Sequence, residues 1–78
     1  MLNVKPRHDI RNLVRRHRLL QGMTQHELAD RVGVTRQTIL SIEKEKYTPS
    51  VALALYLAEV FDVGVEALFQ LNPGENDD

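Results

Sequence analysis

The sequence contains no cysteine and no long run of apolar residues. Without cysteine there is neither a disulfide framework nor a thiolate metal site, and this composition fits a reducing compartment. No stretch approaches the roughly 20 apolar residues that a membrane-spanning helix needs. The opening MLNVKPRHDI also lacks the apolar segment of a signal peptide. We therefore expect a soluble protein that stays in the cytoplasm.

Catalytic and metal-binding patterns are missing as well. His8 and His17 stand nine positions apart, which puts them on opposite sides of any shared helix, and His26 does not complete a zinc site by its spacing. There is no nucleophile with a positioned base, no glycine-rich phosphate loop and no carboxylate pair suited to acid-base catalysis. We predict that the protein is not an enzyme and uses no metal, cofactor or small-molecule ligand.

The formal net charge of −1 hides an asymmetry along the chain. All ten lysines and arginines lie within residues 5–46 together with five acidic residues, which gives this part a charge of +5. Residues 47–78 contain six acidic residues and no basic one, a charge of −6. Such a field would turn the basic part toward a polyanion. The alternative is that the clustered arginines only keep a surface soluble.

Residues 24–47 contain two short helical patterns joined by a tight turn. Thr24, with Glu27 three positions later, forms a capping box, so the first helix should begin at Gln25. Gly33 provides the left-handed residue that ends this helix, and the next helix follows almost at once. Two helices joined by a short glycine-containing turn define the helix-turn-helix geometry, in which the second helix can project from the body.

The second of these helices carries side chains that suit the edges of DNA bases. Thr35 caps its start, and Ile39 and Ile42 form its inward apolar stripe. Outside this stripe, Arg36 suits the O6/N7 edge of guanine and Gln37 suits the N6/N7 edge of adenine. At the N-terminal end of a recognition helix they would meet base edges first. Capped amphipathic helix pairs in bundles that bind nothing are the alternative.

Three further helices should complete the fold. The patterns predict a first helix from Asp9 to Leu20, an almost entirely apolar core helix from Val51 to Phe61, and a short helix from Val65 to Gln70. Leu20 should belong to the buried stripe of the first helix, and Tyr56 should be a packed aromatic residue with its hydroxyl at the surface. The predicted fold class is therefore all-α, a compact five-helix bundle.

The 78 residues are enough for one domain. A domain of this size buries only about 60% of its unfolded surface, so its stability depends on helix caps or on a partner subunit. We assign residues 9–70 to this domain. Residues 1–8 form an arm that is either disordered or places Lys5 and Arg7 on phosphates, and residues 71–78 form an acidic tail.

The stretch TQHELADRVGVTRQTILSIEKEKYTPS resembles the helix-turn-helix family of the lambdoid phage repressors and Cro, also called Xre-type regulators. The resemblance covers residues 10–69 and rests on G-M-T-Q, E-L-A, V-G-V-T-R-Q-T-I and I-E-x-x-K-Y-x-P-S taken together. Glu45 departs from the pattern, since many members have glycine after the recognition helix. The resemblance implies a lambda-repressor-like domain that binds double-stranded DNA and regulates transcription.

The resemblance also implies roles for particular residues. The base-reading positions of the family match Arg36, Gln37 and Ser41, with Thr38 as a further contact to a thymine methyl group. Arg18 and Glu43 match an ion pair between the first helix and the end of the recognition helix. A phosphate contact by Arg18 is the alternative.

Phosphate contacts should come from the helix starts and from the loop after the recognition helix. Free N–H groups and the helix dipole favour an anion at a helix N-terminus, and such contacts fix the register without reading sequence. The residues concerned are Thr24, Gln25, Thr35, Lys44, Lys46 and Tyr47.

One small monomer offers little surface for tight specific binding, so we expect a homodimer on a palindromic operator. Phe69 and Leu71 are apolar side chains that are hard to bury in one chain, and they are the candidate interface. The alternative function is a protein-interaction module of the same fold, such as an antitoxin whose main partner is a toxin protein.

Overall fold

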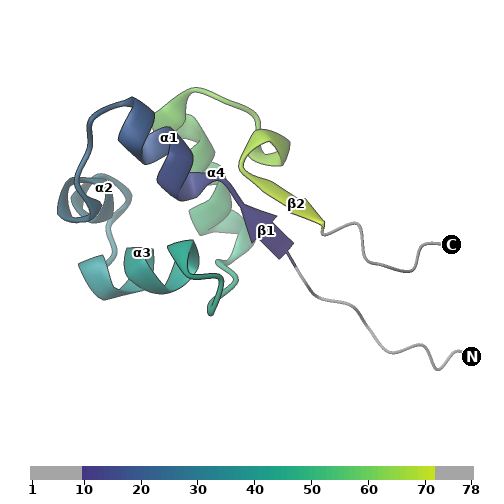
Figure 1. Cartoon of the computed structure of the whole chain (residues 1–78), viewed down its shortest axis with the longest axis horizontal. Helices are drawn as coiled ribbons and strands as arrows, with labels where there is room; N and C mark the ends of the chain where they lie inside the picture. Colours follow the sequence, from purple (N-terminus) through teal and green to yellow (C-terminus); the bar gives the residue numbers. More distant parts are fainter. Residues whose placement is uncertain (1–9, 72–78) are drawn as a thin grey trace, which may run out of the picture.

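The computed structural model describes residues 10–71, which form four α-helices, one 3₁₀ turn and a two-stranded antiparallel sheet (Figure 1). In chain order the elements are β1 (Ile10–Asn12), α1 (Val14–Leu20), α2 (Gln25–Val32), α3 (Arg36–Glu43), α4 (Val51–Phe61), η1 (Val65–Ala67) and β2 (Phe69–Leu71). The expected arm of residues 1–8, Asp9 at the expected start of the first helix, and residues 72–78 lie outside the described residues.

The sheet corrects the expected all-α, five-helix bundle at both ends of the domain. The first helix begins at Val14 rather than Asp9, because residues 10–12 pair with β2, with Asn12 opposite Phe69. The expected fifth helix is only the turn η1, and Leu71 belongs to β2 rather than to a tail. The pairing joins residues 57 or more positions apart, so no local pattern indicates it.

The helix starts follow the capping chemistry expected from the sequence. Thr24 Oγ1 accepts a hydrogen bond from Glu27 N at 3.0 Å, and Glu27 Oε1 accepts one from Thr24 N at 2.8 Å, which is the complete capping box. The Thr35 hydroxyl accepts from Thr38 N at 3.2 Å at the start of α3. Gly33 ends α2 with φ 76°, in the left-handed region that glycine adopts without strain.

The hydrophobic core lies between α4 and the helices α1 to α3. The apolar helix α4 contributes Leu53, Leu57, Ala58 and Phe61, and Leu68 closes the core with no exposed surface. The other buried apolar residues are Val14, Met23, Leu28, Ala29, Ile39 and Ile42. These contacts hold the helix-turn-helix pair, α2 and α3, against the rest of the domain.

Two expected core positions are at the surface. Leu20 is 72% exposed, because α1 ends there and Met23 in the following turn is the residue that enters the core. Tyr56 is 57% exposed, so it is not the packed aromatic residue that we expected. None of the helices within residues 10–71 is long and apolar enough to cross a membrane.

Candidate nucleic-acid interface

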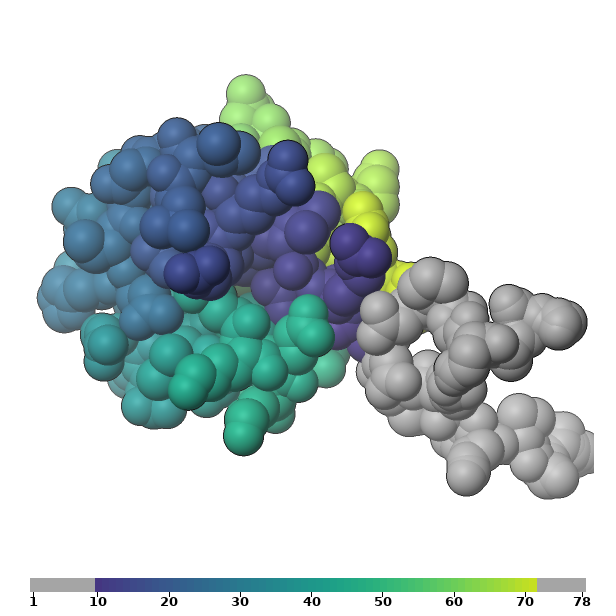
Figure 2. Space-filling model, in the orientation of Figure 1, coloured from purple at the N-terminus to yellow at the C-terminus, as the bar shows by residue number. Residues whose placement is uncertain are grey.

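Helix α3 presents a polar edge on the outside of the domain. Its inward residues Ile39 and Ile42 have no exposed surface, and they pack in the core. On the other side, Arg36 and Gln37 are exposed, and Ser41 is half-buried. Figure 2 shows α3 and the loop after it, in teal, at the surface beside α1 and α2. The polar edge is therefore open rather than packed against the protein interior.

Two hollows flank this edge. A shallow one of about 250 Å³ is lined by Gln37, Thr38, Ser41 and Tyr47. A wider one of about 570 Å³ joins the end of α1, the start of α2 and the start of α3, and it is lined by Arg18, Leu19, Gly22, Met23, Thr24, Gln25, His26 and Arg36. The structure thus brings the expected base-reading residues together in one place and sets the start of α2 beside the first of them.

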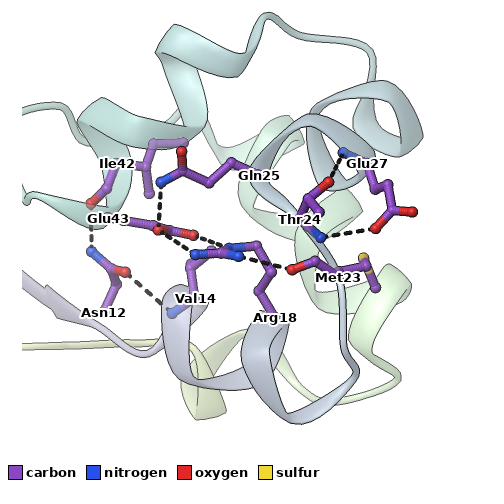
Figure 3. A network of polar contacts seen from close by, with 9 residues as sticks. All are labelled: Asn12, Val14, Arg18, Met23, Thr24, Gln25, Glu27, Ile42 and Glu43. Carbon is purple, nitrogen blue, oxygen red and sulfur yellow. Dashed lines mark hydrogen bonds and ion pairs between the residues drawn. The ribbon is translucent and has the colours of Figure 1, made fainter.

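A network of hydrogen bonds joins α1, α2 and α3 beneath the surface (Figure 3). Arg18 donates from Nε to Glu43 Oε2 at 2.7 Å and from Nη2 to Oε1 at 3.1 Å. The third contact runs from Nη1 to the carbonyl oxygen of Met23 at 2.8 Å, and Gln25 Nε2 donates to Glu43 Oε1 at 3.1 Å. Such charge-assisted, bidentate pairs are stronger than neutral hydrogen bonds.

This network decides between the two roles considered for Arg18. The side chains of Arg18 and Glu43 are only 8% and 3% exposed, and the guanidinium group is taken up by the three contacts to Glu43 and Met23. Arg18 and Glu43 are therefore the ion pair that the resemblance implied, rather than a free phosphate-binding arginine. Gln25 shares this carboxylate, so its side chain is partly committed to holding α3.

The loop after α3 has an unusual backbone conformation. Glu45 has φ 62°, in the left-handed region that favours glycine. Its N–H bonds to Ile42 O and the N–H of Lys46 bonds to Ser41 O, each at 2.9 Å, which satisfies the last carbonyl groups of the helix. Glu45 adopts the conformation expected of glycine, so the substitution leaves the helix end intact. Lys44, Lys46 and Tyr47 are exposed around it.

Asn12 is a residue of this region that the sequence did not single out. Its side chain donates from Nδ2 to Ile42 O at 2.8 Å and accepts at Oδ1 from Val14 N at 3.2 Å. Its backbone N–H donates to Glu45 Oε2 at 3.2 Å. An asparagine at the start of a helix signals a cap, but nothing local indicates that its amide also reaches the end of α3.

The charge asymmetry of the sequence is also an asymmetry in space. Within residues 10–71, the exposed basic residues lie on β1, α1, α2, α3 and the following loop, and they are Arg11, Arg15, Arg16, Arg31, Arg36, Lys44 and Lys46. Three exposed acidic residues, Glu27, Asp30 and Glu45, lie among them on α2 and in the loop after α3, which leaves an excess of positive charge there. The other exposed acidic residues of this range, Glu59, Asp62 and Glu66, lie at the end of α4 and in η1, where no basic residue is found. In this part of the chain no group of three histidine or acidic side chains is placed to hold a metal ion.

A capped helix, a turn with a left-handed glycine and a second helix with an open polar edge define a helix-turn-helix domain. The family model described as Helix-turn-helix matches residues 14–68, and the chain belongs to this family. The match begins and ends with the helical core and leaves out both strands of the sheet.

Similar proteins are named as HTH-type transcriptional regulators. An uncharacterized HTH-type transcriptional regulator of Archaeoglobus fulgidus is 50% identical over 60 residues, which cover 77% of this chain and 86% of that protein. Another, of Methanothermobacter thermautotrophicus, is 57% identical over 49 residues, covering 63% and 71%. These alignments span most of each relative.

A solved structure has a similar fold. The restriction-modification controller protein C.AhdI from Aeromonas hydrophila superimposes with a TM-score of 0.65 at 26% sequence identity. The superposition covers 69% of this chain and 82% of that protein.

Proposed function

We propose that this protein is a sequence-specific, double-stranded DNA-binding transcriptional regulator that reads its operator with α3. The observation that carries the proposal is the open polar edge that begins at Arg36, above the buried pair Ile39 and Ile42. The edge lies in the basic half of the domain, where a polyanion is attracted. Family membership and the regulators among its relatives support the same function.

In this proposal Arg36 and Gln37 read bases from the first turn of α3. Both side chains are exposed and both can make paired hydrogen bonds, each contributing about 1–3 kcal/mol of discrimination against a wrong base. Ser41 follows on the same edge. The Thr38 hydroxyl lies 3.1 Å from the Thr35 hydroxyl, an arrangement that leaves the methyl group of Thr38 to contact a thymine methyl.

Phosphates are held on both sides of this edge. The hydroxyl of Thr24 accepts from Glu27 N, so its own proton remains available for a phosphate oxygen beside the free N–H groups that start α2. Gln25 and Thr35 offer donors in the same way at the starts of α2 and α3. The loop residues Lys44, Lys46 and Tyr47 are exposed beyond the other end of α3 and complete the set.

The protein acts as a homodimer in this proposal. An apolar groove of about 220 Å³ lies between the sheet and the start of α4, lined by Ile10, Thr48, Pro49, Val51, Ala54, Val65 and Phe69. Val51 in its wall and Leu71 on the neighbouring strand are each 76% exposed, and among residues 10–71 no charged side chain lines the groove. A second copy can cover it without bringing like charges together, and apolar surface of this kind marks an interaction site.

Phe69 and Leu71 differ in this interface. Phe69 is half-buried and packs against the core of its own chain, so it forms the floor of the groove, whereas Leu71 projects from the sheet. Two copies joined here would read a palindrome whose half-site centres lie about 34–36 Å apart.

Selection of bound duplexes from a random pool tests the function directly. The expected result is an enriched palindrome with two half-sites, each with base preferences at a few adjacent positions. A pool from which no sequence is enriched would contradict specific reading. Binding of every duplex with equal affinity would leave only phosphate contacts, and the regulator function would have to be abandoned for an interaction module.

A further inference from the structure

Asn12 lies at the meeting point of three elements. It is the last residue of β1, its side chain reaches the start of α1 and the end of α3, and its Cα is paired with that of Phe69 in β2 (Figure 3). Asn12 therefore joins the sheet to the last turn of α3 through its side chain, and to Glu45 in the following loop through its backbone N–H.

Both side-chain contacts of Asn12 are made at helix ends. Leu13, at the N-cap of α1, provides no side-chain hydrogen bond, and Asn12 Oδ1 takes that role by accepting from Val14 N. At the other helix, Ile42 O in the last turn of α3 accepts from the N–H of Glu45 at 2.9 Å. Asn12 Nδ2 donates to the same oxygen as a second partner, from outside the helix.

The residue type is specified by these two contacts. One short side chain must accept from Val14 N and donate to Ile42 O, and only an amide carries both functions at this length. Aspartate keeps the acceptor and loses the donor, and it would set a carboxylate against a carbonyl oxygen. Alanine loses both.

We propose that Asn12 is a positioning residue for DNA recognition, which fixes the end of α3 to the sheet and so holds Arg36 and Gln37 at the angle that base contacts require. This inference rests on the proposed function. An eight-residue helix is about 12 Å long, so a tilt of about 5° at the fixed end moves the other end by about 1 Å. Hydrogen bonds to base edges do not survive a displacement of that size.

The position of Asn12 also ties α3 to the proposed dimer surface. Asn12 pairs with Phe69 in β2, and the same strand carries Leu71. Asn12 therefore connects the recognition helix to the strand through which the two copies would join. In a dimer on a palindrome, both helices must keep their direction relative to the twofold axis. Asn12 is the side chain that links these two requirements.

The test compares Asn12→Asp and Asn12→Ala with the parent protein and with Val60→Ala. Val60 is half-buried on α4 and packs against the core, so its truncation lowers stability, and Val60 lines neither the hollows beside α3 nor the groove. Affinities are measured for the selected duplex and for an unrelated duplex of equal length. Hydrogen exchange of individual amides is followed by NMR.

Both Asn12 variants should lose about tenfold in affinity for the selected duplex, the effect expected of one lost hydrogen bond at a partly buried site. Binding to the unrelated duplex should change by less than about twofold, because phosphate contacts tolerate small tilts. The amides of Glu45 and Lys46 should exchange faster in both variants, whereas the Val14 amide should stay protected in Asn12→Asp alone. Val60→Ala should keep the parent's preference for the selected duplex over the unrelated duplex.

Two results would overturn the inference. If Asn12→Asp binds as the parent does and only Asn12→Ala is impaired, the residue acts by capping α1 and not by holding α3. If Val60→Ala loses the same preference, the effect is one of stability. A parent protein that prefers no sequence refutes the proposed function instead, and the exchange of the Glu45 and Lys46 amides then still decides whether Asn12 holds α3.

Discussion

Arg18 on α1 donates two hydrogen bonds to the carboxylate of Glu43, the last residue of α3, with Nε and Oε2 2.7 Å apart. The pair is almost completely buried, and a third Arg18 donor, on Nη1, bonds to the backbone carbonyl oxygen of Met23. A buried pair of this kind fixes one helix relative to another because neither charge has an alternative partner in water. The direction of α3 thus depends on a charge in α1.

Removing one member of this pair should be costly. We expect Glu43→Gln and Arg18→Met each to lower the free energy of unfolding by about 3 kcal/mol, since each leaves or exposes an unpaired buried group. The double variant Arg18→Met with Glu43→Leu should be more stable than the sum of the single effects implies. Urea unfolding measures all three. The exposed pair His26 and Asp30, 3.7 Å apart, is the control, and His26→Ala should change stability by less than about 0.5 kcal/mol.

Removing the helix caps Thr35 and Ser50 one at a time should separate an effect on stability from an effect on DNA binding. Thr35→Ala and Ser50→Ala each remove the side-chain acceptor at a helix start, so each should cost about 1 kcal/mol of stability. Only Thr35 lies at the proposed DNA surface. Thr35→Ala should therefore weaken DNA binding, and Ser50→Ala should not when both are measured well below their melting temperatures. Equal loss of binding in the two variants would contradict a phosphate contact by Thr35.

Glycine at position 45 should stabilise the end of α3. Glu45 has φ 62°, a conformation that costs a side chain other than glycine about 1 kcal/mol. Its carboxylate recovers part of that cost through an exposed hydrogen bond to Asn12 N. Glu45→Gly should raise the free energy of unfolding by about 0.5 kcal/mol, and thermal unfolding should show a higher midpoint. A fall in the midpoint would mean that the bond to Asn12 outweighs the strain.

Base recognition by Arg36 and phosphate binding by Lys46 should be separable by mutation. Arg36→Ala should relax base preference at one position of the selected site, at a cost of about 1–3 kcal/mol on that sequence. Lys46→Ala should weaken binding to all duplexes alike and reduce the slope of affinity against salt by about one unit. Affinities over a salt series on matched and mismatched duplexes distinguish the two. Identical profiles would refute the division of roles.

The groove beside the sheet should decide the oligomeric state. Leu71→Asp places a charge on the proposed interface and should shift sedimentation from dimer to monomer, together with a loss of operator affinity. Leu20→Asp is the matched control, because Leu20 is 72% exposed but lies at the end of α1 away from β1. If both variants sediment as the parent does, the groove is not the dimer interface.

Much of the central part of the domain followed from the sequence. The caps Thr24 and Thr35, the left-handed Gly33 and the apolar α4 are local signals, and α2 and α3 begin where these caps place them. The same holds for the polar edge of α3, because the inward positions Ile39 and Ile42 fix which side of a short helix faces out.

The structure at the two ends of the domain could not be predicted from the sequence. Residues 10–12 and 69–71 are too few for a pattern that distinguishes a strand from a helix end. Each segment forms a strand by pairing with the other, which lies almost a whole domain away in the sequence. The amide of Asn12 and the groove beside β2 exist only because that pairing brings β1 to the end of α3 and β2 to the start of α4.

The sequence by itself determined a capped pair of helices, the polar face of the second one and a basic half of the chain, because caps, periodicity and charge act over a few residues. Only the tertiary structure decided that residues 10–12 and 69–71 form a sheet, that the Asn12 amide bonds to the last turn of α3 and that the apolar surface forms a groove at that sheet. Those features depend on residues far apart in the chain, whose proximity is set by the burial of the common core.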